Sequence, residues 1–147
     1  MQICLVFIAF SPVSVFDEQT EFIQQLLSDH YDDSARTLSV KRYELNVTNS
    51  GFCRYKRYFS NGKEEYFSFN LTKFRDLDYY GTVEKGELYL RTKGEDVIVQ
   101  TYNDRKEGDV DSMATYMVIP LRNIEPEYLS DLSERLFRLN ARQLAQK

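Results

Sequence analysis

The sequence lacks tryptophan and has a single histidine, His30, together with six glycines. One histidine excludes metal sites built from several histidines. It also makes any Ser-His-Asp or Cys-His catalytic arrangement depend on His30 alone. None of the glycines has the neighbours of a phosphate-binding loop. We therefore predict no metal and no cofactor.

Cysteine is also scarce, since only Cys4 and Cys53 are present. Cys4 lies in an apolar leader, so removal of the leader would leave Cys53 single, whereas retention would permit a Cys4–Cys53 disulfide. The cations Arg54, Lys56 and Arg57 near Cys53 would favour a reactive thiolate. We favour the simpler interpretation that Cys53 is a small apolar residue on a strand.

Charge of either sign is not in large excess, with 19 basic and 23 acidic residues and a net charge of −4. This balance argues against a general polyanion binder, and we predict no nucleic-acid partner. The segment 54–58 nevertheless alternates cations with tyrosines, as surfaces for single-stranded nucleic acids do. Strand alternation places Arg54, Lys56 and Tyr58 on one face, which we take as a candidate binding patch together with Tyr79 and Tyr80.

No charged residue precedes Asp17, and residues 3–16 are almost wholly apolar. The run is shorter than the roughly 20 residues of a spanning helix, but it suits the hydrophobic region of an export signal. It lacks a basic segment in front and a clear cleavage site. We predict that residues 1–16 are an export signal or apolar leader, and that no membrane span is left after its removal. The alternative is a buried first strand in a cytoplasmic protein.

The remainder, residues 17–147, is predicted to be one domain. Apolar residues at helical spacing, among them Ile23 and Leu27, predict a helix over 17–35. Alternating patterns then predict five to seven strands within 36–122, with Asn61-Gly62 as a hairpin turn with positive φ at both positions. The mixed segment 72–85 is interpreted as a packed connection or short strand, and the polar segment 103–112 as an exposed loop.

A final helix is predicted over 123–147, with Asn123 as its cap and Pro126 in its first turn. Leucines recur every three or four residues, so the helix presents an apolar stripe that we expect to cover the sheet. Acidic residues early and arginines late suit the helix dipole.

These elements predict an α+β fold in which an antiparallel β-meander or small barrel carries a helix at each end. This order of elements is similar to that of the pleckstrin-homology-like barrel, although no residue motif supports more than the order. The alternative is an open antiparallel sheet with both helices on one face. Fold alone does not give function.

For function, we expect a small exported, non-catalytic module that binds a protein or a small ligand, because no nucleophile, base and oxyanion donor can be assembled. Its location would be periplasmic, envelope-associated or secreted. The alternatives are an enzyme that uses Cys53 or His30, and a structural subunit of a cell-envelope assembly.

Overall fold

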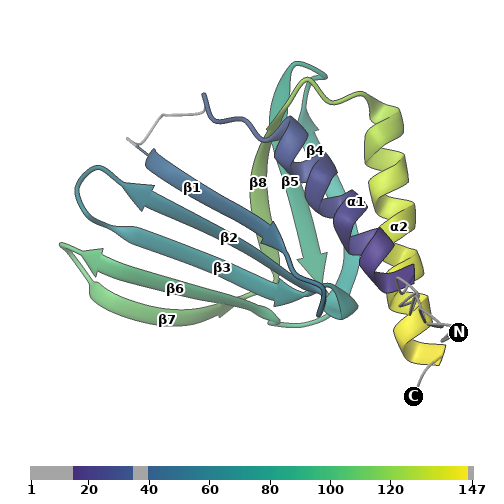
Figure 1. Ribbon diagram of the computed structural model, residues 1–147. Helices are drawn as coiled ribbons and strands as arrows, with labels where there is room; N and C mark the ends of the chain where they lie inside the picture. The colour runs from purple at the N-terminus through teal and green to yellow at the C-terminus, as the bar shows by residue number, and fades with distance from the viewer. Residues whose placement is uncertain (1–14, 35–39, 146–147) are drawn as a thin grey trace, which may run out of the picture.

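The computed structural model describes residues 15–34 and 40–145. Its described part is an α+β fold of two helices and eight antiparallel strands in two sheets, which do not close into a barrel (Figure 1). The elements are α1 Val15–His30, β1 Val40–Val47, β2 Phe52–Phe59, β3 Glu64–Asn70, η1 Leu71–Lys73, β4 Phe74–Gly81, β5 Lys85–Thr92, β6 Val97–Asp104, β7 Gly108–Ala114, β8 Tyr116–Arg122 and α2 Pro126–Ala145.

The long sheet has the order β1-β2-β3-β6-β7 and the short sheet the order β4-β5-β8. They are the two halves of one meander that is bent along a crease. The short helix η1 joins β3 to β4, residues 93–96 join β5 to β6, and Thr115 joins β7 to β8. Hydrogen bonds cross the crease, because the Lys93 N–H donates to the Lys73 carbonyl and the Thr92 N–H to the Thr115 carbonyl.

The bend follows from unequal numbers of residues on neighbouring strands at the crease. Ser68 pairs with Ile98 and Phe74 with Thr92, so β3–β4 and β5–β6 keep one register through the crease. On the other side, Thr115 alone lies opposite residues 93–96. The extra residues on the β5–β6 strand act as a large bulge, and bulges bend and twist the strand that carries them.

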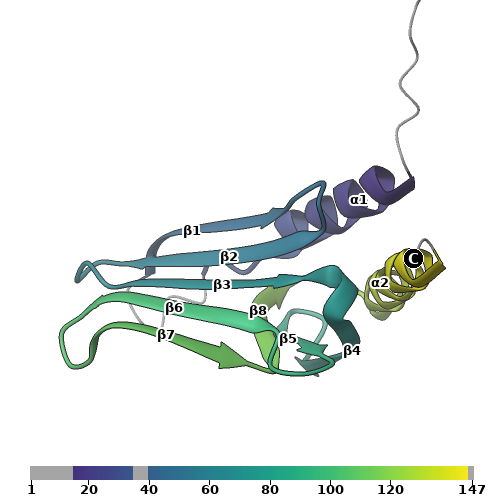
Figure 2. The same cartoon turned by 90° about the horizontal axis from the view of Figure 1, so that it is seen from below.

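Both helices pack on the same side of the short sheet, and the long sheet extends away from them (Figures 1 and 2). The core lies between the helices, one face of the short sheet and the near half of one face of the long sheet. We call this face of the long sheet the inner face and the opposite one the outer face. The fully buried side chains of the core include Ile23, Leu27, Phe69, Phe74, Leu88, Ile119, Leu121 and Leu132.

Both predicted helices are present at the predicted positions, but the end of the first and the start of the second were predicted wrongly. The first helix ends at His30 rather than at residue 35, because Tyr31 forms a bridge with Leu121 and the Asp32 N–H donates to the Pro120 carbonyl. Asn123 is not the helix cap. It has a positive φ of 51°, and its N–H donates to the Glu84 carbonyl.

Of the two alternatives for segment 72–85, a packed connection or a short strand, the strand is correct, since the segment contains β4. The prediction of a loop over 103–112 is wrong in part, since β7 begins at Gly108. The hairpin at Asn61-Gly62 is correct, but only Gly62 has a positive φ (92°), so the predicted turn type is wrong. The Phe59 N–H donates to the Lys63 carbonyl, which closes a three-residue loop with glycine at the left-handed position.

The predicted leader and Cys4 lie outside the described residues. Among the helices that the structure describes, none combines the length and apolarity needed to cross a membrane. The leucine stripe of α2 covers the sheet, as predicted, since Leu132, Leu136 and Leu139 are buried.

The packing of α2 predicts a graded response to the same substitution at two positions. Leu132 is fully buried, whereas Leu129 is only partly buried at the edge of the core. Leu132→Ala should lower the free energy of unfolding by about 2–5 kcal/mol, since it leaves a cavity. Leu129→Ala, the matched control, should cost clearly less in urea denaturation. Equal losses would contradict this placement of the core.

Candidate functional site

Strand β2 carries cations and aromatics on both of its faces. Cys53, Tyr55 and Arg57 point to the inner face, and Arg54, Lys56 and Tyr58 to the outer face, as the burial and the pairing with β1 and β3 show. The predicted grouping of Arg54, Lys56 and Tyr58 on one face is therefore present in the structure. It lies on the face that the helices do not cover.

The outer face carries a row of aromatic rings across the long sheet. Tyr66 lies between Tyr58 and Tyr102, with ring centroids 6.1 Å and 5.2 Å away. Two cations cap the row, with the Arg42 guanidinium 4.1 Å from the Tyr58 centroid and the Lys56 ammonium 4.9 Å from that of Tyr66. The Tyr66 hydroxyl donates to Glu64, which raises the pKa of Tyr66. The groups of this face largely contact one another.

The other predicted residues, Tyr79 and Tyr80, lie on β4 of the short sheet and point to opposite faces. The Tyr79 hydroxyl donates to the Thr82 carbonyl at 2.6 Å. Tyr80 is exposed, and its ring contacts that of Tyr89 at 5.0 Å. The structure therefore does not join Tyr79 and Tyr80 with Arg54, Lys56 and Tyr58 into one patch.

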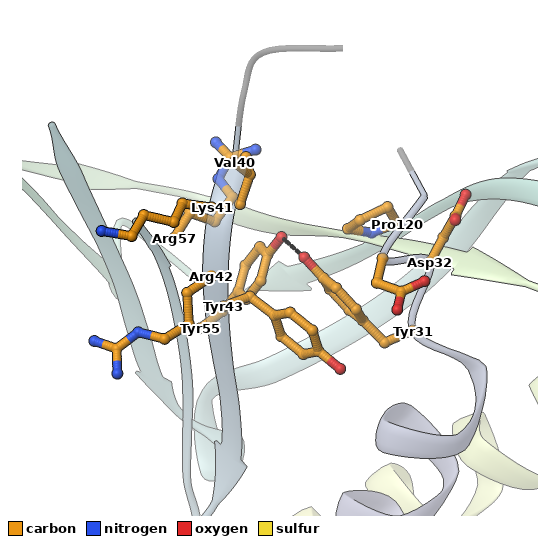
Figure 3. Close-up of a pocket in the computed structure, with 10 residues that line it drawn as sticks. Tyr31, Asp32, Val40, Lys41, Arg42, Tyr43, Tyr55, Arg57 and Pro120 are labelled. Carbon is orange, nitrogen blue, oxygen red and sulfur yellow. Dashed lines mark hydrogen bonds between the residues drawn. The ribbon is translucent and has the colours of Figure 1, made fainter. Parts of the chain in front are cut away.

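A cleft lies where the inner face of the long sheet meets the side of β8 that faces away from the helices. One hollow, of about 260 Å³, lies between β1 and the segment after α1, with Tyr31, Tyr43 and Arg57 among its lining residues (Figure 3). A second hollow, of about 360 Å³, is lined by Phe67, Val99 and Val118, among others. Arg57 and Pro120 line both hollows, so the two adjoin, and we call them together the inner cleft.

Arg57 stands at the corner of the inner cleft. Its Nη2 is 3.1 Å from Oε1 of Glu65, its partner across β2 and β3, and both side chains are partly buried. Its guanidinium also lies 5.5 to 5.8 Å from the ring centroids of Tyr55, Phe59 and Phe67. The Arg57 Nε is buried and has no hydrogen-bond partner among the described residues. An unpaired buried donor is costly to the folded state.

Three tyrosines form one end of the cleft. The rings of Tyr31 and Tyr43 stack with centroids 3.8 Å apart, and the hydroxyls of Tyr31 and Tyr55 hydrogen-bond at 2.5 Å (Figure 3). Burial raises the pKa of Tyr31 and that of Tyr55, so both hydroxyls stay protonated at neutral pH. The tyrosines join the segment after α1 to β1 and β2 and give this end a rigid aromatic wall.

Two carboxylates at the same end already have partners. Asp32 accepts hydrogen bonds from the backbone N–H and the hydroxyl of Ser34. Burial raises the pKa of Asp32, but the bonds from Ser34 outweigh it, so the net pKa is lowered. Asp33 forms an ion pair with Arg122 at 3.1 Å. Both carboxylates line the first hollow, and Asp32 stays ionised at neutral pH because its pKa is lowered.

Comparisons with protein families, characterised proteins and solved structures give no match. The chemistry of the cleft therefore supplies the functional inference. No group of three metal-ligating side chains occurs in the described part of the chain.

The thiol of Cys53 lies in the core and not in the inner cleft. Cys53 is a free thiol with no exposed surface, and its sulfur is 3.9 Å from the sulfur of Met117. Burial raises the pKa of Cys53 to about 12. The positive neighbours on β2 do not lower it, because Arg54 and Lys56 point to the other face. The small apolar role is the one that this geometry supports.

His30 ends α1 and also lies apart from the inner cleft. Its Nδ1 is 3.3 Å from the Arg122 carbonyl, and its ring contacts that of Tyr128 at 5.3 Å. It lines a small apolar hollow between the helices rather than either half of the inner cleft. The structure does not bring His30 and Cys53 together.

Sequence reasoning missed most of the inner cleft because it singled out the outer face of β2 instead of the inner one. The alternation in 54–58 was visible, but Tyr55 and Arg57 were assigned no role. One signal was available: the hairpin at Asn61-Gly62 places Arg57 opposite the acidic residue Glu65. Pro120 and Val118 carried no such signal.

The burial of Cys53 predicts slow reaction with a thiol reagent. A pKa of about 12 leaves roughly one thiol in ten thousand ionised at pH 8. In a Cys4→Ser variant, which retains Cys53 as its only cysteine, Ellman's reagent should react over hours in buffer and within seconds in urea. Labelling of the native protein at the rate of a free cysteine would restore the thiol-enzyme hypothesis.

Proposed function

We propose that this protein is a non-catalytic binding module whose inner cleft holds a ligand. The observation that carries the proposal is the position of Arg57, a partly buried cation at the junction of two hollows with apolar walls. Concave sites with apolar walls and a few convergent polar groups are the usual form of ligand sites. The summed size of the two hollows is within the range of such sites.

The absence of a catalytic role is part of this proposal, and the positions of the titratable groups support it. A nucleophile needs a base within hydrogen-bond reach, and neither Cys53 nor His30 faces the inner cleft. The carboxylates of Asp32 and Glu65 are each bound to a neighbour and have no mobile proton to deliver. Ligand binding requires only a hollow of suitable shape and polarity, and the two hollows of the inner cleft support it.

A second candidate function, a subunit of a larger assembly, is favoured by the outer face. Neither helix covers it (Figure 2). Besides the tyrosine row it exposes Ile98 and Met113, which lie side by side on β6 and β7. Exposed apolar groups on an open sheet face are typical of protein contacts. Cross-linking in intact cells would test this alternative.

The binding proposal can be tested with methyl groups on the two faces of the same strands. Val99 and Ala114 line the inner cleft, whereas Ile98 and Met113, their neighbours in sequence, point to the outer face. In a screen of small organic fragments by methyl NMR, binders should shift the Val99, Ala114 and Val118 methyls and leave those of Ile98 and Met113 unchanged.

The matched variants are Ala114→Phe, which fills the second hollow, and Met113→Phe, which adds the same ring on the other face. The first should abolish fragment binding and the second should not. Shifts confined to Ile98 and Met113, or no binder in a broad library, would contradict the proposal.

Export remains part of the proposal through the apolar leader, and intact mass tests it. Protein recovered from its native compartment should lack the mass of an amino-terminal segment that ends near residue 16. Leu5→Asp, which interrupts the apolar run, should leave the chain unprocessed in the cytoplasm. Recovery of the full-length mass from the unaltered sequence would contradict export by a cleaved signal.

A further inference from the structure

The two sheets have four edge strands, β1 and β7 in the long sheet and β4 and β8 in the short one. Three of these edges carry a cap from outside the sheet. The Gln24 amide bonds to the backbone of β1, the Asn140 amide to that of β4 and the Asp32 N–H to that of β8. Strand β7 has no comparable cap in the part of the chain that the structure describes.

The register of the long sheet shows which backbone groups of β7 point outward. Gln24 bonds to Leu45, so Leu45 turns its backbone groups out of the sheet. Opposed residues of antiparallel strands alternate between bonded and non-bonded pairs. One row of opposed residues runs across the sheet through Leu45, Tyr55, Phe67, Val99 and Ser112. Ser112 is therefore bonded to β6, whereas Asp111 and Met113 on either side of it, and Asp109, turn their N–H and C=O groups outward.

The outward edge of β7 is open to another chain. No residue of 15–34 or 40–145 bonds to its outward backbone groups. The strand is exposed from Gly108 to Met113, and it forms the margin of the long sheet away from both helices (Figure 1). Such a row of unpaired N–H and C=O groups is a template for a further strand. Strand addition of this kind is a common way of binding an extended peptide.

The side chains of β7 favour a partner of one charge. Asp109, Asp111 and Met113 alternate along the outer face. Neither aspartate takes part in an ion pair with a described residue. Asp109 accepts a hydrogen bond from the Asn103 N–H, which leaves its charge uncompensated. Opposite charges on opposed residues stabilise a strand pair, so lysine or arginine fits opposite both aspartates.

The same carboxylates disfavour the pairing of β7 with β7 of a second copy. The antiparallel register that uses all seven residues is centred on Asp111. It places Asp111 directly opposite Asp111 of the other copy, and like charges at opposed positions are destabilising. Shifted registers separate the two charges but shorten the paired segment. A cationic strand from a different protein meets neither difficulty.

We propose that β7 accepts an extended cationic segment of another protein as an added strand of the long sheet. Two basic side chains of the segment lie opposite Asp109 and Asp111, and an apolar one lies opposite Met113. The residue between the two cations lies on the inner face, next to the exposed side chain of Val110. This interaction uses the edge of the sheet and does not depend on a ligand in the inner cleft.

The probe is the acetylated and amidated peptide Thr-Ile-Thr-Lys-Val-Lys-Thr, titrated into the full-length protein and followed by amide NMR. In the antiparallel register its lysines lie opposite Asp111 and Asp109, and its isoleucine lies opposite Met113. It should bind about tenfold more tightly than the same peptide with both lysines replaced by glutamate, since two opposed charge pairs change sign. The difference should narrow in high salt, which screens exposed charges.

Two N-methylated forms of the probe separate strand addition from simple attraction of charge. In the added strand the two lysines turn their N–H groups to β7, whereas the neighbouring threonine and valine turn theirs away. Methylation of the lysine nitrogens should abolish binding, and methylation of the other two should not. The amides of Asp111 and Met113 should exchange quickly with solvent in the free protein and slowly with the probe bound, while that of Ser112 exchanges slowly in both.

Variants of the protein test the same two contributions. Met113→Pro removes one outward N–H but no bond to β6, and an edge strand tolerates proline at such a position. It should abolish binding of the lysine probe although both aspartates remain. D109N/D111N keeps the backbone and should weaken the lysine probe about tenfold. Glu44→Gln, on the outer face of the opposite edge strand β1, is the control and should leave the affinity unchanged.

Four results would overturn the proposal. They are equal affinity for the lysine and glutamate probes, equal binding by the two methylated probes, amide shifts confined to another edge strand, and no binding of the lysine probe. A dimer in sedimentation that Met113→Pro dissociates would also overturn it, because the occupant of β7 would then be a second copy of this chain.

Discussion

The contact of β8 with the inner face of the long sheet is the interaction on which the rest of the structure depends. Met117 of β8 touches Cys53 of β2, and Ile119 and Leu121 follow it into the core under the two helices. Alternate side chains of a strand point to opposite faces. Once Met117, Ile119 and Leu121 are committed to the core, Val118 and Pro120 must face away from it. Strand β8 therefore makes the core on one side and one wall of the inner cleft on the other.

The crease makes this contact possible. A flat meander would leave one face to be covered along its whole length, and the two helices are too short for that. Bending the sheet lets the short sheet return toward the long one, so part of the sheet covers itself. The far half of the long sheet then has no helix over it, and Phe67, Val99 and Ala114 on its inner face pack against the core but stay only partly buried. Such a partly apolar hollow on a single layer of sheet is where a binding function is expected.

Periodicity in the sequence predicted the elements well where burial is one-sided, as for α2 and β2, and poorly where it is not. Strand β7 was taken for a loop because Asp109 and Asp111 make it polar, yet charged residues are a common protection of an edge strand. The end of α1 was placed too late because the bridge of Tyr31 to Leu121 joins residues far apart in sequence. Only a tertiary contact could have shown it.

Periodicity could not identify the inner face of β2 for a different reason. In 54–58 both faces of β2 carry a cation and a tyrosine, so alternation separates Arg54, Lys56 and Tyr58 from Tyr55 and Arg57 without telling which set points inward. That depends on where β8 and α1 pack. Outward groups such as Arg42 and Tyr58 contact one another on the outer face, whereas Arg57 is partly buried on the inner face and pairs with Glu65.

The ion pair of Arg57 and Glu65 is partly removed from water at the corner of the cleft. Taking an ion pair out of water has a large cost, and apolar residues of similar size are often as stable or more so. The rings of Tyr55, Phe59 and Phe67 around Arg57 would pack equally well against a methionine or leucine. A fold that needed only stability would have little use for a guanidinium there, and none for one with an unpaired Nε. Departures from local stability rules concentrate at functional sites. The cost of Arg57 at this corner is therefore one argument for the proposal that the inner cleft holds a ligand.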